Sequence, residues 1–423
     1  MKIISLKFID NYKQFRKGQI FRFTSENVTT LSFADPKLTI LIGRNGSGKT
    51  TLMSLIPTLF YYIERYNGKI PANFELKYEI RLNEEDIKVS IKHINNLIRV
   101  SVAGVYNNIQ LLPNRNPRQY DYSVINTEQP YILYEDFRNY TPNSVVTSTF
   151  SMHGEYPISR PRNYLGDQLV SDQSITNIYG KNHYNMGSIS RGIFRFVKLF
   201  FNGRKEIKDL LNLFDLKFTN NVLIYYYGSE NEWNRVNKKW ISKKESEIQN
   251  NEIYLNDIEF ERLGRKITLN NMSSGEKMLL LRAISVLNSI EENSIIIFEE
   301  PELHLDQVWN RQLATLFKVL FSDYHSHLLI ATHDYAIINS VLKDNIISLE
   351  NGQKKQIIEN TFLASYEELF RIIYGNKFKA NKIEIDFLAS ISDKSIEQLK
   401  KDYEMIGNSI YKYLVYKEII RRS

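Results

Sequence analysis

LTILIGRNGSGKTT, residues Leu38–Thr51, is the stretch that decides the fold of this chain. Its first residues are apolar and predict a buried strand, while the apolar spacing of residues 52–59 predicts an amphipathic helix. Between them lies G-x-x-x-x-G-K-[ST], a loop whose glycines let backbone N–H groups turn toward a phosphate chain. The stretch therefore predicts a nucleotide site; the alternative is a glycine loop that serves only as a turn.

The loop and the start of the helix supply the predicted nucleotide contacts. Lys49 is long enough to reach the outer phosphates, and the Thr50 hydroxyl is a ligand for Mg²⁺. The helix N-terminus adds partial positive charge at the same place. The residues expected to bind the nucleotide here are Asn45, Gly46, Ser47, Gly48, Lys49, Thr50 and Thr51.

Composition narrows the class of protein. The 423 residues have room for one large α/β domain with insertions, or for two to three domains. The absence of cysteine excludes disulfides, thiolate zinc sites and cysteine nucleophiles. A net charge of +7 permits nucleic-acid binding without demonstrating it. Because no apolar run approaches the ~20 residues that cross a bilayer, we expect a soluble, cytoplasmic protein without a membrane partner.

The chain reads as four segments. They are an N-terminal part with the phosphate loop (1–105), an irregular insertion rich in Asn, Pro, Tyr and Ser (106–188), a helical lobe with the later buried strands (189–360) and a C-terminal helical segment (361–423). Strands are predicted at 2–8, 20–32, across 74–105, at 131–134 and at 145–150. Helices are predicted at 189–214, 274–289, 305–321 and 395–420, and 228–251 is read as a polar stretch.

Two acidic residues follow a second buried strand. Ile295–Phe298 is apolar and leads directly into Glu299, Glu300 and Pro301. Carboxylates at the carboxyl end of a buried strand lie where open α/β sheets bind ligands. One carboxylate can orient Mg²⁺ and the other can polarise the water that attacks a phosphate.

Two further polar segments have a structural and a functional interpretation. Ser273 and Gly275, in the sequence MSSGEK, open a predicted helix that could bind an anion or could simply carry a capping box. His333 follows the predicted strand 328–331 and could be a phosphate contact or a polar end-cap.

The order of these motifs resembles the head of ABC-class ATPases, most closely the soluble branch with double-strand-break-repair, SMC, RecF and overcoming-lysogenisation ATPases. Asn11–Phe15 (NYKQF) is similar to the N-terminal element of that branch in which a basic residue, here Lys13, approaches the nucleotide. Glu302–Asp306 is similar to the loop after the acidic pair. The resemblance implies an α/β fold with a mixed sheet around the phosphate loop, an antiparallel β subdomain and a helical lobe.

The resemblance also implies a site shared by two chains stacked head to tail. ATP and Mg²⁺ on the Lys49 and Thr50 of one chain would meet Ser273 and Gly275 of the other, and Asp306 would face the partner. Glu300 would act as general base, Glu299 would hold Mg²⁺ with Thr50, and His333 would contact the γ-phosphate.

Three departures from the family pattern stand out. Glu299 replaces the usual aspartate, which predicts weaker Mg²⁺ positioning and slower turnover, and Ser274 replaces a glycine. The glutamine that normally links the metal site to the insertion has no clear counterpart. Gln129 is one candidate, and Ser148–Met152 is the other candidate for that loop.

The particular role is predicted from what the chain lacks and carries. It has no long coiled-coil arm, cysteine hook or fused nuclease motif, so it resembles stand-alone anti-phage defence ATPases such as the Septu ATPase PtuA. In this interpretation its nucleotide state regulates a separate effector, a nuclease encoded nearby. The alternative is a RecF-like DNA-binding repair ATPase that contacts phosphates through the basic helix 191–208 and Lys238, Lys239, Lys243 and Lys244.

Overall fold

A computed structural model describes residues 1–24, 38–65, 70–112, 130–148, 170–172, 186–226, 229–250, 252–303, 305–374, 382–407 and 409–423. The chain divides into two compact units, Met1–Leu369 and Phe370–Ser423. The sequence predicts a C-terminal segment from residue 361, whereas this division falls later, within helix α9 (Tyr366–Tyr374).

A mostly parallel sheet surrounds the phosphate loop in the first unit. Its strand order is β10-β9-β15-β16-β3-β17-β18, and only β18 runs antiparallel to its neighbour. Each strand that bears a site motif is central and buried, so the motifs meet at one edge of the sheet. The strands are β3 (Leu38–Gly43), β9 (Val145–Ser148), β10 (Val170–Asp172), β15 (Ile295–Glu299), β16 (His327–Ala331), β17 (Ile346–Glu350) and β18 (Gln353–Lys355).

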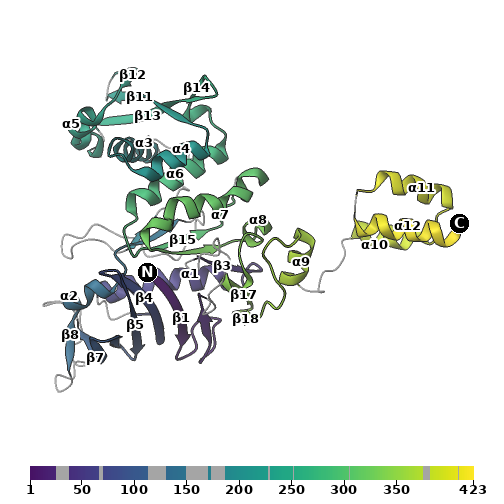
Figure 1. The fold of residues 1–423 in the computed structure, drawn as a ribbon, viewed down its shortest axis with the longest axis horizontal. Helices are drawn as coiled ribbons and strands as arrows, with labels where there is room; N and C mark the ends of the chain where they lie inside the picture. Colours follow the sequence, from purple (N-terminus) through teal and green to yellow (C-terminus); the bar gives the residue numbers. More distant parts are fainter. Residues whose placement is uncertain are drawn as a thin grey trace. The chain divides into compact units, whose positions relative to one another are not determined.

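A second, mostly antiparallel sheet lies on the other side of helix α1 (Lys49–Arg65), as Figure 1 shows. Leu52, Ile56 and Phe60 of α1 belong to one buried core that also contains residues of both sheets. This packing holds the first turn of α1, and with it the phosphate loop, in a fixed place. The strands, in sheet order, are β2 (Ile20–Arg22), β1 (Lys2–Phe8), β4 (Phe74–Leu82), β5 (Glu85–Ile94), β6 (Leu97–Val102), β7 (Tyr106–Leu112) and β8 (Tyr131–Leu133).

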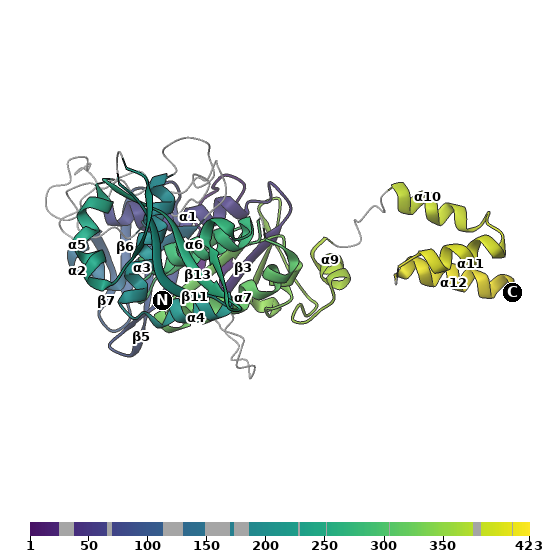
Figure 2. The same cartoon turned by 90° about the horizontal axis from the view of Figure 1, so that it is seen from above.

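A separate lobe of the same unit carries the helix that begins at Ser274. Figure 2, viewed from above, shows this lobe in front of the rest of the unit. Helix α3 packs on the four-stranded sheet through aromatic contacts, with the Phe196 ring 5.3 Å from that of Phe218. The lobe contains α3 (Met186–Phe201), α4 (Lys205–Leu213), β11 (Lys217–Tyr226), β12 (Asn231–Arg235), α5 (Lys238–Gln249), β13 (Ile253–Arg262), β14 (Arg265–Thr268) and α6 (Ser274–Ser289).

The remaining elements of the first unit include the helix that covers the other face of the parallel sheet. The ring of Phe317 on α7 stacks 4.4 Å from the ring of Phe298 on β15. No helix among the described residues is both long enough and apolar enough to cross a membrane. These elements are α2 (Tyr134–Phe137), α7 (Gln307–Phe321), α8 (Tyr335–Ile338) and short 3₁₀ turns at Arg138–Tyr140, Leu269–Asn271, Ser322–Tyr324 and Lys343–Asn345.

The second unit is a small helical group with its own core. Ile391, Leu399 and Val415 are buried in it, which supports packing on the same chain for part of the predicted apolar stripe. The single long helix predicted over 395–420 is wrong, because Ser395 and Ser409 each cap a separate helix. The helices are α10 (Lys382–Ile391), α11 (Ile396–Met405) and α12 (Ile410–Arg422).

Three other predictions of secondary structure need correction. The helix expected over 189–214 is two helices, because Gly203 adopts φ +75° between α3 and α4. The polar stretch 228–251 contains α5, whose start Asn237 caps by accepting from Trp240 N. Within the insertion, β7 was not expected and extends the antiparallel sheet. The strands predicted there at 131–134 and 145–150 are confirmed as β8 and β9, and β9 pairs with β15.

The α/β fold class predicted from the sequence is confirmed. A mixed sheet surrounds the phosphate loop, an antiparallel sheet backs α1, and a lobe of helices with its own small sheet carries the SSGE segment.

Candidate functional site

The phosphate loop joins β3 to α1 and depends on two glycines. Gly43 adopts φ +151°, and a side chain there would lie 2.6 Å from Ser47 Oγ. Gly48 adopts φ +105°, and a side chain there would lie 2.5 Å from Gln14 Nε2. Neither position accepts another residue without moving its neighbours, so the loop conformation is specified by sequence.

Two distant segments support the loop. The backbone N–H of Gly352 donates to Ser47 O at 2.9 Å, and the Gln19 side chain donates to Gly352 O at 2.8 Å. On the other side the turn that contains Gln14 packs against Gly48. Lys13 lies in this turn, exposed and with its ammonium 5.8 Å from the centre of the Tyr12 ring. The structure therefore places Lys13 beside a residue that touches the loop.

Lys49 is buried at the first position of α1, with 8% of its surface exposed. Its ammonium donates to Gly43 O at 2.8 Å and lies 2.8 Å from His333 Nε2. Burial lowers the pKa of Lys49, while the carboxylates of Glu300, Glu299 and Glu302 act in the opposite direction. A cation held in this way among three acids is well placed to receive a polyanion.

Thr50 and Glu299 meet between α1 and the sheet. The Thr50 hydroxyl donates to Glu299 Oε1, and the Glu299 side chain is 6% exposed. The contact follows from the pleat: Ile295 and Ile297 belong to the core around α1, and Glu299 shares their side of β15. Two hard oxygen ligands for a divalent cation are thereby brought together from residues far apart in sequence.

His333 follows β16 and closes the other side of the Lys49 ammonium. Burial lowers the pKa of His333, and the positive charge of Lys49 lowers it further. A neutral imidazole whose Nε2 accepts from the ammonium carries its proton on Nδ1. His333 is therefore part of the constellation, and the interpretation of a simple end-cap does not account for its contact with Lys49.

Glu302 is a site residue that sequence reasoning did not single out. Its Oε1 accepts from Thr332 Oγ1 at 2.7 Å and from His333 N at 2.9 Å, so it fixes the backbone that carries the imidazole. Burial raises the pKa of Glu302, although these two hydrogen bonds oppose the shift. A third acid so soon after Glu299 and Glu300 is the signal that was available in the sequence.

Glu300 lies at the end of β15 in an unusual backbone conformation. Its φ is +45°, which side chains other than glycine, asparagine and aspartate rarely adopt. Its backbone N–H donates to Ala331 O at 2.8 Å. Its carboxylate is partly exposed and is the largest of the charges that raise the pKa of Lys49. Glu300 thus faces the phosphate site with access for water.

Ser273, Gly275 and Asp306 occupy helix starts elsewhere. Ser273 is exposed and forms a capping box with Glu276, and Gly275 is buried at the start of α6. Asp306 is exposed and caps α7 by accepting from Val308 N and Trp309 N. Within the described residues no hydrogen bond or ion pair joins these three positions to the phosphate loop. The chain alone therefore brings together only half of the predicted site.

Both candidates for the glutamine loop fall largely outside the described part of the chain, namely Gln129 and residues 149–152. Ser148, the first residue of the second candidate, is the last residue of β9. It pairs in register with Phe298, directly before Glu299. Ser148 therefore lies beside the acidic pair, and the assignment of the glutamine loop stays a prediction.

The residues present fit ATP and Mg²⁺. Ser47 Oγ is buried, and among the described residues it has no hydrogen-bond partner. It lies in a glycine loop at the N-terminus of a 17-residue helix, with the Lys49 ammonium nearby. This combination suits a phosphate chain. Thr50 and Glu299 supply the oxygen ligands that Mg²⁺ takes in addition to phosphate oxygens and water.

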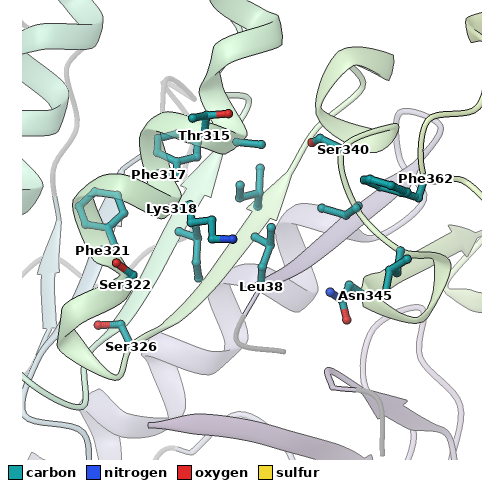
Figure 3. A pocket seen from close by; sticks show the side chains of 15 residues that line it. Leu38, Thr315, Phe317, Lys318, Phe321, Ser322, Ser326, Ser340, Asn345 and Phe362 are labelled. Carbon is teal, nitrogen blue, oxygen red and sulfur yellow. The ribbon is translucent and has the colours of Figure 1, made fainter. Parts of the chain in front are cut away.

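A cavity elsewhere in the unit is distinct from this site. It has a volume of about 160 Å³ and lies against Leu38 and Leu328, toward the amino ends of β3 and β16. Figure 3 shows Phe317 and Lys318 of α7 over it, with Phe362 across the opening. Because the phosphate loop and His333 follow the carboxyl ends of the same strands, the cavity and the nucleotide site occupy opposite ends of the sheet.

Comparison with known families defines the class of protein. The chain belongs to the family described as "AAA domain, putative AbiEii toxin, Type IV TA system", whose profile matches residues 38–339. No curated protein sequence matches it. The family assignment supports the predicted class, an ATPase of the P-loop type.

Several solved structures share a distant likeness. They include an SMC head domain from Thermotoga maritima (14% identity, 84% of this chain, 97% of that chain, TM-score 0.39). They also include an SMC head bound to the C-winged helix domain of ScpA (13% identity, 87% and 100%, TM-score 0.42). A nucleotide-free ATP-binding cassette from an ABC transporter is a third (12% identity, 89% and 96%, TM-score 0.30).

Proposed function

We propose that this chain binds and hydrolyses ATP, dimerises through its nucleotide sites, and regulates a separate cytoplasmic effector in bacterial anti-phage defence. One observation carries the catalytic part of the proposal. Lys49, Thr50, Glu299 and His333 come from three strand ends and meet in one partly buried cluster beside Glu300. A structural core would not require an ammonium, an imidazole and two carboxylates to be gathered at the ends of its strands.

Each group has a distinct task in hydrolysis. Lys49 and the loop N–H groups bind the phosphate chain, and His333 orients the γ-phosphate. Glu300 accepts a proton from water as the water oxygen bonds to the γ-phosphorus and the bond to the bridging oxygen of ADP breaks. Thr50 and Glu299 would hold Mg²⁺, which would supply positive charge to neutralise the phosphate oxygens. The products are ADP and phosphate.

The exposed helix starts indicate a partner chain. Ser273 and Asp306 present unburied oxygen atoms that satisfy only the N–H groups of their own helices. A second copy stacked head to tail would bring Ser273 of one chain to the Lys49 of the other. The proposed site is complete only in such a dimer.

Mixing two inactive variants tests this arrangement. We expect Lys49→Ala and Ser273→Arg each to be inactive, whereas a 1:1 mixture should recover about a quarter of the wild-type rate through composite sites. Ser395→Arg is the matched control, because Ser395 forms the same kind of capping box in the second unit. Recovery that fails although native mass spectrometry detects mixed dimers would contradict the shared site.

The regulatory role rests on what the chain resembles. A resemblance to stand-alone defence ATPases such as PtuA is the expectation from the sequence alone, and the family description names a toxin and a Type IV TA system. Both are compatible with an ATPase that acts together with another gene product. The test is purification with the genomic neighbours co-expressed, followed by mass determination with and without ATP. A stoichiometric complex with a nuclease is the expected result.

A RecF-like DNA-binding function is the second candidate, and the charge pairing disfavours its main surface. On the basic helices Lys198 pairs with Glu245, Arg204 with Glu206, and Lys244 with Glu247. Lys238, Lys239 and Lys243 of α5 are exposed and remain the best phosphate contacts. If DNA binding is tighter than micromolar and falls steeply with salt, and if a triple change of these lysines to Glu removes it, the repair function is favoured.

A further inference from the structure

Arg282 is a fully buried charged residue in the middle of α6, the helix that Ser273 caps. It is 2% exposed and is the largest of the fully buried side chains in the described structure. Removing a guanidinium from water is costly unless its N–H groups and charge find partners. The stability of the buried Arg282 guanidinium therefore depends on the groups that it contacts.

The contacts of Arg282 converge on two strand ends. Its Nε donates to Ser148 Oγ at 2.5 Å, and Nη2 donates to Ser148 O at 2.6 Å and to Glu299 O at 3.1 Å. The guanidinium carbon also lies 5.1 Å from the centre of the Phe298 ring. Arg282 therefore joins α6 to the last residue of β9 and to the acidic end of β15.

The Glu299–Glu300 peptide is consequently held from both sides. Its carbonyl oxygen accepts from Arg282, and its N–H donates to Ala331 O of β16. Directly after this peptide the backbone turns to the left-handed conformation of Glu300, which a glutamate does not adopt without support. The two hydrogen bonds supply that support and thereby fix the direction in which each carboxylate leaves the backbone.

We propose that Arg282 is a positioning residue that couples the α6 helix to the catalytic carboxylates. It acts through the peptide that it holds. Because Ser273 caps α6, a partner nucleotide that engages Ser273 would act on the same helix that orients Glu299 and Glu300. The inference rests on the proposed function, in which Ser273 meets the nucleotide of a second chain and Glu300 activates water.

Arg282→Met is the direct test, since methionine keeps an apolar stem beside Phe298 and removes every guanidinium hydrogen bond. We expect ATP affinity, measured by fluorescent nucleotide titration, to change by less than about threefold, and kcat to fall about 100-fold. Arg282→Lys retains the charge without the planar fork and should recover part of kcat. If Arg282→Met does not fold, the kcat of Arg282→Lys is the test of the proposal instead.

Arg195→Met is the matched control. Arg195 is a half-buried arginine that bonds to α6, donating to Ser285 Oγ at 2.8 Å, but it does not contact the acidic peptide in the described structure. Both methionine variants should lower the melting temperature, and only Arg282→Met should lower kcat. Equal kcat losses in the two variants would show that Arg282 is merely structural.

A double variant separates this inference from the proposed function. If Arg282 acts through Glu300, adding Arg282→Met to Glu300→Gln should cause little further loss of kcat. Wild-type kcat in Arg282→Met, with Glu300→Gln inactive, overturns the role of Arg282 alone. Wild-type kcat in Glu300→Gln overturns the assignment of the catalytic carboxylate on which both proposals depend.

Discussion

Lys49 and Ser273 stand at the starts of two helices of similar length, α1 and α6, yet the chain treats them differently. Lys49 is buried and is bonded to groups from two other strand ends. Ser273 is exposed and bonds only within its own helix start. One helix start is completed by the fold, and the other is left open.

The difference separates what one chain can do from what needs a second surface. The Lys49 half is held by the same core that stabilises the fold, so it is present before any ligand binds. The Ser273 half is a helix N-terminus whose serine forms only a local capping box, and its role as an anion site stays a prediction. We infer that nucleotide binding belongs to the first half and that the control of hydrolysis belongs to the second.

The assignment of nucleotide binding to the Lys49 half is wrong if ATP binding does not depend on Lys49. Lys49→Ala removes a cation on which Glu299, Glu300 and Glu302 act, so ATP would meet carboxylates without this compensating charge. We expect the Kd for ATP to rise by at least about 100-fold in a fluorescent nucleotide titration. Lys239→Ala, an exposed lysine on α5, is the control and should bind normally. Tight binding by Lys49→Ala would contradict the site.

Glu300→Gln sharpens the comparison by separating binding from hydrolysis. The amide keeps the shape of the side chain but cannot accept the proton of water, so kcat should fall by about 100- to 10,000-fold. Because binding resides in the Lys49 half, the Kd for ATP should stay within about twofold, and a dimer should accumulate with ATP. The control is Glu292→Gln, an exposed acid before β15. Size-exclusion light scattering and phosphate release provide the measurements.

The sequence predicts the Lys49 half well because its signals are local. The glycine loop, the strand before it and the acids after β15 each occupy a few consecutive residues, and the rule that ligands bind at carboxyl ends of parallel strands brings them together. Roles for Lys13, Asp306 and Ser273 came from a family resemblance and stay predictions. The partners of Asp306 and Ser273 would lie on another chain.

The sequence could not predict the contacts between segments that no motif or periodicity links. The bond from His333 N to Glu302 and those from Arg282 to Ser148 and Glu299 depend on strand order, which periodicity does not encode. The helix expected over 395–420 failed for a different reason. Its apolar spacing continues across Gly407, while the cap at Ser409 starts a new helix.

Variants of Glu302 test whether the Lys49 half of the site is held by hydrogen bonds or by negative charge. Glu302→Ala removes the acceptor for His333 N and Thr332 Oγ1, and we expect kcat to fall about tenfold. Glu302→Gln keeps an acceptor oxygen and should retain most of kcat. Equal kcat losses in the two variants would show that the negative charge, and not the hydrogen bonds, supports His333.

The raised pKa of Glu302 also predicts how the stability of Glu302→Gln relative to wild type changes with pH. Burial raises the pKa of Glu302, so the folded chain keeps this proton above the pH at which the unfolded chain releases it. Ionising the buried carboxylate therefore costs stability as the pH rises from the unfolded pKa through the folded one. Without an ionisable group at residue 302 that loss disappears, and the melting temperature relative to wild type should increase with pH across this window. A constant difference between the two proteins would contradict the raised pKa.

The smallest expected effect concerns Glu299, where related ATPases usually carry aspartate. Glu299 accepts directly from Thr50 Oγ1, so the longer side chain fills part of the space that a hydrated Mg²⁺ would use. Glu299→Asp withdraws the carboxylate by one methylene while keeping its charge and its place on β15. We expect the Mg²⁺ concentration for half-maximal activity to fall, and kcat to rise, by roughly threefold each. Glu299→Gln, which keeps the length and loses the charge, should change both quantities in the opposite direction. If Glu299→Asp instead lowers kcat, the Lys49 half already fits glutamate. The slow turnover predicted from glutamate in place of aspartate is then wrong.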